Sequence, residues 1–295
     1  MTSAGGTRLV LGLVSGLGNS FWNVVVKASE TVLLGGGYGV VFAELRDDPE
    51  RIGHYEELAR SGHVAGLALY APPPTLASRL LATARPTVLL YAGAPAGVVV
   101  PTFCVANREA VGELMRHLLG LGHRRIAHLA GPDENIDARE RLDAYRYELA
   151  VAGIPYDPEL VWPGDFSFVA GTRAAARYLA LAERPTAVFA ATDEMAIGLI
   201  SGLRDSGVSV PEAVSVAGFD GTDLSAMYQP ALTTMLQPRA ELGRLAAESL
   251  LRRLAGGPPE TATVRLPCRL VLRQSVVAPA GDTPDASRAV EPISR

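Results

Sequence analysis

One aspartate late in the chain marks the place where chemistry is most readily expected. Residues 214–219 are apolar and β-branched and lead into Asp220 and Gly221, the pattern of a buried strand that stops at a turn. An acid directly past the carboxyl end of a parallel strand lies where open α/β sheets place their ligands. The Asp220 carboxylate can accept two hydroxyl hydrogen bonds or pair with an arginine. An aspartate that only caps a turn or a helix is the alternative.

Two arginines begin a helical pattern that follows a predicted strand ending at Gly131. These residues, Arg139 and Arg141, each present a planar fork of donors that can hold vicinal hydroxyls or a carboxylate through two bonds. Cations are unfavourable at the start of a helix, because the helix dipole favours anions there, and this mild cost indicates a purpose. We therefore expect Arg141 to bind a ligand and to pair with Asp220. A solvated surface arginine is the alternative for Arg139.

The segment after the first predicted strand combines glycines, a helix cap and two aromatic rings. Gly16 and Gly18 are spaced as in a dinucleotide-binding fingerprint, but Phe21 occupies the sixth position, where close packing requires Gly or Ala. A cap at Asn19 followed by Phe21 and Trp22 is better suited to stacking on the apolar face of a sugar or a base. Burial of each ring in the core is the alternative.

Other candidate residues also fall at strand ends. Phe166 follows Asp165, and Thr192 precedes Asp193, with capping of the next helix as the alternative for Thr192. The five histidines are scattered, none has a partner at metal-ligand spacing, and no Ser/His/Asp arrangement is present. We therefore predict no catalytic residue, no metal site and no cofactor.

Strand and helix patterns alternate along the chain and must position these residues. In the first half, strands are predicted over 9–14, 40–45, 64–70 and 87–91, and helices over 21–34, 49–61 and 76–84. The pattern then restarts, with strands over 125–130, 187–190 and 214–219 and helices over 109–120, 137–152, 172–182 and 195–206. Residues 230–238 suggest a short crossing, 240–254 a last helix and 263–272 an extended segment. Two successive α/β units indicate two similar lobes, with a ligand site expected in the cleft between them.

Six motifs, in order and in register, resemble those of LacI/GalR-type transcription regulators. They are GHRRIAHLAGP at 122–132, ARER at 138–141, AVFAATDEMAIG at 187–198, VPEAVSVAGFD at 210–220, LTTMLQP at 232–238 and LVLRQS at 270–275. The resemblance implies an α/β fold with two similar doubly wound parallel-sheet lobes joined by three crossings, the periplasmic-binding-protein-like type I architecture. We expect the first lobe to comprise 8–106 plus 239–266, the second 107–238 plus 267–277, and flexible tails at 1–7 and 278–295.

The resemblance also implies which residues contact a ligand. The family's ligand arginine falls on Arg141, its strand-end aspartate on Asp220 and its cleft aromatic on Phe166. Its aromatic loop position falls on Phe21 and Trp22, and its crossing glutamine on Gln237. The predicted ligand-binding residues are therefore Asn19, Phe21, Trp22, Arg141, Phe166, Thr192, Asp220 and Gln237.

The chain departs from the family pattern at three places near the expected cleft. Thr192 stands where Asn is common, Tyr91 and Ala92 stand where a strand commonly ends in Asp-Arg, and Ala106 replaces the usual Asp before Asn107. These replacements change the reach and the donors of the expected site, so they argue against a common hexose as the ligand.

Composition limits the partners of this chain. Its 295 residues carry a formal net charge of -4 and no long run of Lys or Arg, which argues against a nucleic-acid surface of its own. The N-terminus lacks the pattern of a secretory signal, and no stretch approaches the ~20 apolar residues of a membrane span. A cytoplasmic protein without a membrane partner is expected. Cys104 and Cys268 lie in apolar surroundings and are expected to be buried free thiols.

Regulators of this type carry an N-terminal helix-turn-helix and a hinge helix that read DNA. Because only a few residues precede the first predicted strand, operator DNA is expected to bind only through a head domain missing from this chain. The leading hypothesis is a homodimeric effector-binding domain that takes a small molecule, a sugar or sugar-like polyol, in its cleft and thereby modulates DNA binding. A solute-binding protein of a sugar transporter is the alternative. An NAD-dependent oxidoreductase with its cofactor at Gly16 and Gly18 is the third hypothesis.

Overall fold

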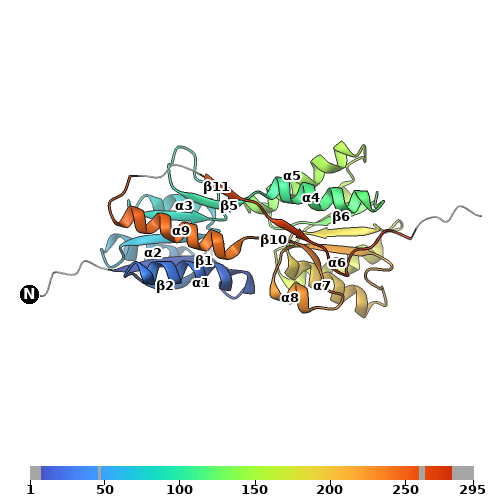
Figure 1. Cartoon of the computed structure of the whole chain (residues 1–295), viewed down its shortest axis with the longest axis horizontal. Coiled ribbons are helices and arrows are strands. Elements are labelled where there is room, and N and C mark those ends of the chain that lie inside the picture. The colour runs from blue at the N-terminus through green and yellow to red at the C-terminus, as the bar shows by residue number, and fades with distance from the viewer. Residues whose placement is uncertain (1–7, 46–47, 259–262, 281–295) are drawn as a thin grey trace, which may run out of the picture.

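A computed structural model describes residues 8–45, 48–258 and 263–280 and shows two lobes side by side, each built on a six-stranded sheet (Figure 1). The first sheet has the spatial order β11 (Thr263–Leu266), β5 (Thr102–Val105), β4 (Thr87–Leu90), β3 (Gly66–Tyr70), β1 (Leu9–Ser15) and β2 (Gly39–Leu45). Every neighbouring pair in it is parallel. The helices of this lobe are α1 (Ser20–Gly35), α2 (Pro49–Arg60), α3 (Pro74–Leu81) and α9 (Arg239–Leu254).

Alternate residues of the first sheet enter two different hydrophobic cores. Val10 and Val14 of β1 pack with α1 and α9 on one face, whereas Leu11 and Leu13 pack with α2 and α3 on the other. Successive side chains of a strand point to opposite faces, and a sheet buried on both faces therefore has strands that are apolar throughout. This explains why β1 and β3 appear in the sequence as uninterrupted apolar runs.

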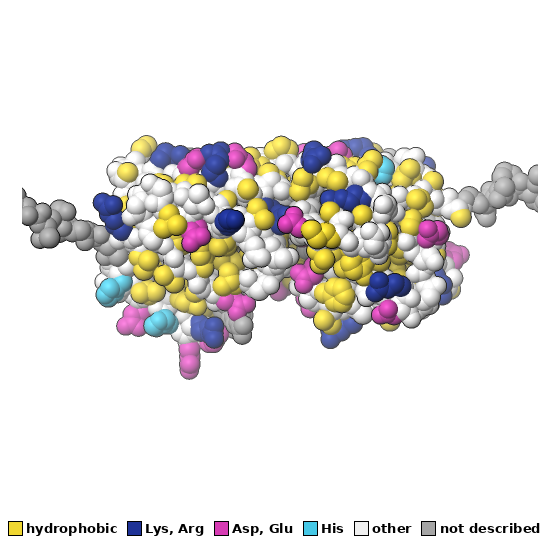
Figure 2. Space-filling model, turned by 60° about the horizontal axis from the view of Figure 1, so that its bottom comes forward, with side chains coloured by type: hydrophobic (Ala, Val, Ile, Leu, Met, Phe, Trp, Pro, Cys, Tyr) yellow, Lys and Arg dark blue, Asp and Glu magenta, His cyan; other side chains and the backbone are white. Residues whose placement is uncertain are grey.

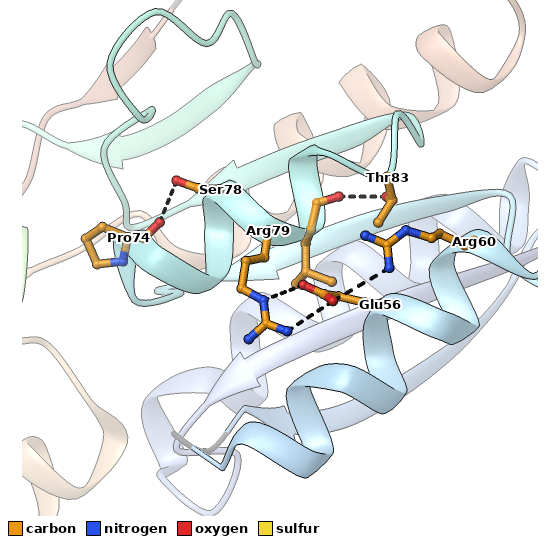
Figure 3. Close-up of polar contacts among 7 residues, drawn as sticks. Glu56, Arg60, Pro74, Ser78, Arg79 and Thr83 are labelled. Atoms are coloured by element: carbon orange, nitrogen blue, oxygen red, sulfur yellow. Dashed lines mark hydrogen bonds and ion pairs between the residues drawn. The ribbon is translucent and has the colours of Figure 1, made fainter.

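An ion pair joins the two helices that cover one face of the first sheet. Glu56 of α2 accepts two hydrogen bonds from Arg79 of α3, at 2.5 Å to Nε and 3.1 Å to Nη2, and Arg60 lies 3.6 Å away (Figure 3). Both guanidinium groups lower the pKa of the Glu56 carboxyl, and the hydrogen bond from Arg79 has the largest effect. The bidentate geometry fixes the packing of α2 against α3.

The second sheet repeats the arrangement of the first. Its spatial order is β12 (Arg269–Val271), β10 (Thr233–Leu236), β9 (Ser215–Asp220), β8 (Ala187–Ala190), β6 (Ile126–Leu129) and β7 (Val161–Trp162). Only β12 runs antiparallel to its neighbour. Around it lie α4 (Asn107–Gly120), α5 (Ile136–Val151), the 3-10 helix η1 (Pro158–Leu160), α6 (Phe168–Ala180), α7 (Asp193–Asp205) and α8 (Asp223–Met227). The predicted fold of two similar doubly wound parallel-sheet lobes is confirmed.

The chain passes between the two sheets three times: from β5 to α4, from β10 to α9, and from β11 to β12. The first and third crossings lie against each other, since the backbone N–H of Ala106 donates to the carbonyl of Leu266 at 2.9 Å. The two lobes are therefore joined by three chain segments, two of which lie side by side. Such an arrangement permits hinge motion between the lobes.

Several local predictions were incomplete. The segment 230–238 contains strand β10, and the extended segment 263–272 divides into β11 and β12, which belong to different sheets. Strands β5 and β7 and helix α8 were not predicted. The two residues of β7 and the five of α8 are too few to show a period, whereas β5 has four residues, as many as the predicted strands β4 and β8. Helix α6 begins at Phe168, four residues earlier than predicted, because Ser167 caps it through the N–H of Ala170.

Both cysteines are free, and burial raises the pKa of the Cys104 thiol to about 11 and that of Cys268 to about 12. Among the described residues, no helix combines the length and the apolar character needed to cross a membrane. Of the predicted tails at 1–7 and 278–295, residues 1–7 and 281–295 lie outside the described residues, and only residues 278–280 are described.

Candidate functional site

A cavity of about 140 Å³ lies between the lobes, at the carboxyl ends of strands from both sheets. Its lining includes all eight residues predicted to bind a ligand: Asn19, Phe21, Trp22, Arg141, Phe166, Thr192, Asp220 and Gln237. Ser15 ends β1, Ala71 follows β3, Tyr91 follows β4, and Asp220 ends β9. Strand ends from two facing sheets are where a two-lobed α/β protein places a ligand.

A larger cavity, of about 470 Å³, lies apart from these strand ends. It is lined mainly by charged side chains of α4 and α5, among them the exposed Arg108 and Glu109. Solvated charges at the surface place few convergent groups around a ligand, so the smaller cavity between the lobes is the better candidate.

Asp220 lies at the base of the candidate site and is bound by the crossing glutamine. The amide Nε2 of Gln237 donates to Oδ1 of Asp220 at 2.7 Å. Burial raises the pKa of Asp220 well above its ordinary value, while the charges of Arg141 and Arg239 act against this shift. The remaining oxygen of Asp220 has no hydrogen bond to any described residue and can accept one from a ligand hydroxyl.

Two buried polar atoms beside Asp220 have no partner among the described residues. They are Oε1 of Gln237 and the hydroxyl of Tyr91. A buried acceptor or hydroxyl without a partner costs about 1–3 kcal/mol, so a ligand that pairs with these atoms would recover that free energy. A ligand that carries both hydrogen-bond donors and acceptors is therefore expected to bind here more favourably than an apolar ligand.

Arg141 is buried, with only 3% of its surface exposed, and is held by three groups of its own lobe. Its Nε donates to Oδ1 of Asn107 at 2.9 Å, its Nη1 donates to the carbonyl of Ala191 at 2.6 Å, and its guanidinium lies 3.8 Å from the ring centre of Phe219. Its Nη2 forms no hydrogen bond with a described residue, so this donor remains for a ligand.

The expected ion pair between Arg141 and Asp220 is not formed. The arginine is bound by Asn107 and Ala191 and the aspartate by Gln237, although the charge of Arg141 still acts on the pKa of Asp220. Asn107 and Ala191 therefore lie within hydrogen-bonding distance of Arg141, whereas Asp220 does not. Arg139 is exposed, as its alternative interpretation required.

An aromatic wall covers the first-lobe side of the cavity. Phe21 and Trp22 pack edge to face with a centroid separation of 5.0 Å, and each lies against Tyr91, at 5.3 Å and 5.4 Å. Both rings belong to the hydrophobic core, as the alternative interpretation expected, and they also line the cavity. Such a wall can support the apolar face of a sugar ring or a base.

Asn19 and Thr192 are both helix caps that also face the cavity. Oδ1 of Asn19 accepts from the N–H of Phe21 at 2.8 Å at the start of α1, and Oγ1 of Thr192 accepts from the N–H of Met195 at 3.3 Å at the start of α7. The N–H of Phe21 already donates to Asn19, and a pyrophosphate bound at the start of α1 would need that N–H. This weakens the dinucleotide interpretation.

Backbone strain is concentrated around the cavity. Five described non-glycine residues have positive φ, and four of them line the cavity: Ala71 at 48°, Tyr91 at 51°, Phe166 at 67° and Asp220 at 129°. Conformations of this kind cost about 1–3 kcal/mol each and persist where the surrounding structure imposes them, often at ligand sites. The strain supports the same location for the site.

Asp193 anchors the strand ends without lining the cavity. Its carboxylate is fully buried and accepts from the N–H of Thr222 at 2.7 Å, from the Thr222 hydroxyl at 3.0 Å and from the Thr234 hydroxyl. Gly218 permits this approach, because a Cβ there would lie 2.5 Å from Oδ1 of Asp193. Asp193 thereby ties α7 to the turn after β9 and to β10.

Some residues at the site escaped the sequence reasoning. The cavity is also lined by Ser15, Ala71, Tyr91, Asn135 and Asp137. Asn107 was noted only as the neighbour of Ala106, yet it is fully buried and binds Arg141, Asp137 and Glu140. Its position directly after an apolar strand was the available signal. Among the described residues, no group of three or more His, Cys, Asp or Glu is placed to hold a metal ion.

Comparisons with known proteins give a consistent relationship. The family described as a periplasmic binding protein-like domain matches residues 115–276. The HTH-type transcriptional repressor CytR of Escherichia coli (strain K12) is 32% identical over 280 residues, which cover 92% of this chain and 80% of CytR.

Solved structures agree with the sequence relatives. The complex of the transcriptional regulator CelR with cellobiose has a TM-score of 0.85 at 31% identity, covering 92% of this chain and 85% of CelR. The lac repressor dimer bound to operator and the anti-inducer ONPF has a TM-score of 0.81 at 26% identity, covering 93% and 96%. The chain belongs to the LacI family of transcription regulators and forms the ligand-binding regulatory domain of that family.

Proposed function

We propose that the chain senses a small polyhydroxylated molecule, a sugar or sugar-like polyol, in the cavity between its lobes. The observation that carries this proposal is a set of polar atoms without a partner among the described residues, all in side chains that line the cavity together with the aromatic rings: Oε1 of Gln237, the Tyr91 hydroxyl, the second oxygen of Asp220 and Nη2 of Arg141. A polyol offers donors and acceptors on its edge and apolar C–H groups on its face. CelR, a relative, is described in complex with cellobiose.

The eight cavity residues predicted from the sequence are proposed as the ligand contacts, with Arg141, Asp220 and Gln237 binding hydroxyls and Phe21, Trp22 and Phe166 stacking on the ring. The effector would favour one lobe angle, and that angle would set the DNA affinity of a cytoplasmic regulator. We assign lobe boundaries at 8–106 plus 239–266 and at 107–238 plus 267–277. No catalytic step and no cofactor enter this proposal.

A thermal-shift screen tests the effector proposal. Pentoses, hexoses, disaccharides, polyols, nucleosides, amino acids and inorganic anions would each be added in large excess to the chain. A compound present at 100 times its dissociation constant stabilises the folded state by about 2.7 kcal/mol, which raises the melting temperature by several degrees. If only amino acids or anions stabilised the protein, the polyol assignment would be wrong.

We also propose that the chain is a homodimer. In Figure 1, α1, β2 and α8 lie along one edge of the molecule, and Figure 2 shows hydrophobic side chains on this side of both lobes. Large apolar side chains are exposed there: Leu34, Val41, Leu224 and Met227, the last with 76% of its surface exposed. The lac repressor is described as a dimer. Exposed apolar side chains of this kind mark association surfaces.

Replacing Met227 by aspartate is expected to weaken the dimer roughly 10–100-fold, because a symmetric interface receives two buried carboxylates. Sedimentation equilibrium at micromolar concentration measures the change. Val151→Asp on α5 is the matched control, since Val151 is 66% exposed but lies on another side of the molecule. Equal weakening by both substitutions, or a monomeric wild-type chain, would contradict the assigned surface.

A further inference from the structure

Three side-chain hydrogen-bonding contacts join described residues of the two lobes. Arg239 donates to the carbonyl of Gly221 at 3.0 Å, and Arg265 pairs with Glu140 at 3.1 Å. Both contacts lie beside crossing segments, where they brace the hinge. The third contact lies elsewhere: Nδ2 of Asn19 donates to Oε2 of Glu194 at 2.8 Å.

The position of the third contact gives it leverage over the lobe angle. Asn19 follows β1, which is three strand steps from the crossing strand β5, and Glu194 follows β8, which is two steps from β10. With about 4.8 Å between neighbouring strands, the end of β1 lies on the order of 15 Å from the first crossing at β5, although Arg239 after the second crossing reaches the carbonyl of Phe21 at 3.5 Å. A hinge rotation about the first and third crossings therefore separates Asn19 from Glu194 further than it separates Arg265 from Glu140.

Local structure holds both partners ready for this contact. The Oδ1 atom of Asn19 is committed to capping α1 through the N–H of Phe21, so the amide Nδ2 is directed away from that helix. Glu194 lies in the first turn of α7, directly after Asp193, which is fixed by the two threonines. Both side chains are half-buried, and burial raises the pKa of the Glu194 carboxyl. Little side-chain freedom remains to be lost when they meet.

We propose that Asn19 and Glu194 form a latch between the two lobes beside the cavity, which holds the lobes together at this edge. Asn19 also lines the cavity, so the latch connects the ligand site with the lobe angle. The latch deepens the proposed function, since an effector would bind between lobes that are already held at this edge. The latch is a hydrogen bond between two side chains of the chain itself and involves no ligand atom, so it can be tested without an effector.

Asn19→Asp is the decisive substitution. Aspartate caps helices as well as asparagine, so α1 keeps its cap, but the donor to Glu194 becomes a second carboxylate and the two repel each other. In Asn19→Asp combined with Glu194→Gln, the glutamine amide can donate to the new aspartate and restore the contact. Asn23→Asp is the matched control, because it adds the same charge to an exposed position in the same helix.

Distances between spin labels at Glu57→Cys on α2 and Ala176→Cys on α6 report the lobe separation, measured on labelled protein diluted with unlabelled protein and without any sugar. We expect Asn19→Asp to shift the distribution to longer distances, the double variant to return it to the wild-type distribution, and Asn23→Asp to leave it unchanged. Asn19→Ser keeps a cap but cannot reach Glu194, so it should also lengthen the distance if Asn19→Asp fails to fold.

A wild-type distance in both Asn19→Asp and Asn19→Ser would overturn the latch, as would a double variant that stays as open as Asn19→Asp alone. These outcomes leave the effector proposal untouched, because no effector is present. Conversely, a thermal-shift screen that finds no stabilising polyol would count against the effector proposal. The spin-label distances that test the latch would be unaffected by that result.

Discussion

Replacing Arg141 by alanine is expected to lower the affinity for the effector about 100-fold, or ~2.7 kcal/mol. Arg141 lines the cavity and its Nη2 has no hydrogen bond to a described residue, and hydrogen bonds from a charged donor are the strongest that the site can offer. The charge of Arg141 also opposes the raised pKa of Asp220, so its removal further favours the protonated carboxyl. Isothermal titration calorimetry with the compound identified by the thermal-shift screen measures the loss.

Two variants separate binding from folding in this experiment. Arg139→Ala removes an exposed arginine two residues away in the same helix and should leave the affinity unchanged. Arg141→Lys keeps the charge but not the planar fork, so its affinity should fall between wild type and Arg141→Ala. Because Arg141→Ala leaves Oδ1 of Asn107 and the carbonyl of Ala191 unpaired, titrations must be run well below its melting temperature. Unchanged affinity in a folded Arg141→Ala protein would refute the assignment.

Replacing Asp193 by alanine is expected to lower the free energy of unfolding by about 3 kcal/mol. The substitution removes the acceptor of three hydrogen bonds and leaves the buried N–H of Thr222 without a partner. Burial raises the pKa of Asp193, and relief of this desolvation offsets part of the loss. Chemical denaturation followed by circular dichroism gives the free energy.

Asp205 provides the control at the other end of α7. Its side chain is 70% exposed, and Asp205→Ala should change stability by less than about 0.5 kcal/mol. The loss in Asp193→Ala should also weaken effector binding, because β10 and the turn after β9 position Gln237 and Asp220. Equal stability of the two variants would show that Asp193 does not anchor these strand ends.

The fold was largely determined by local sequence patterns. Strands such as β1 and β9 have apolar interiors because both faces of a parallel sheet are buried, and glycines or caps mark the ends of α1 and α7. Short elements were different. A strand of two residues such as β7 has no period to detect, and the division of 263–272 between two sheets depends on partners far away in the chain.

Residue types and strand ends, together with the family resemblance that alone indicated Gln237, also pointed to the candidate site, since the eight predicted residues line one cavity. Only the tertiary structure decided which of these residues bind one another. Arg141 and Asp220 have complementary charges, but Asn107, Ala191 and Gln237 stand closer and take their hydrogen bonds. The latch between Asn19 and Glu194 joins residues 175 positions apart. A hydrogen bond depends on a few ångströms of separation, and such distances between lobes are fixed by packing, which no local pattern records.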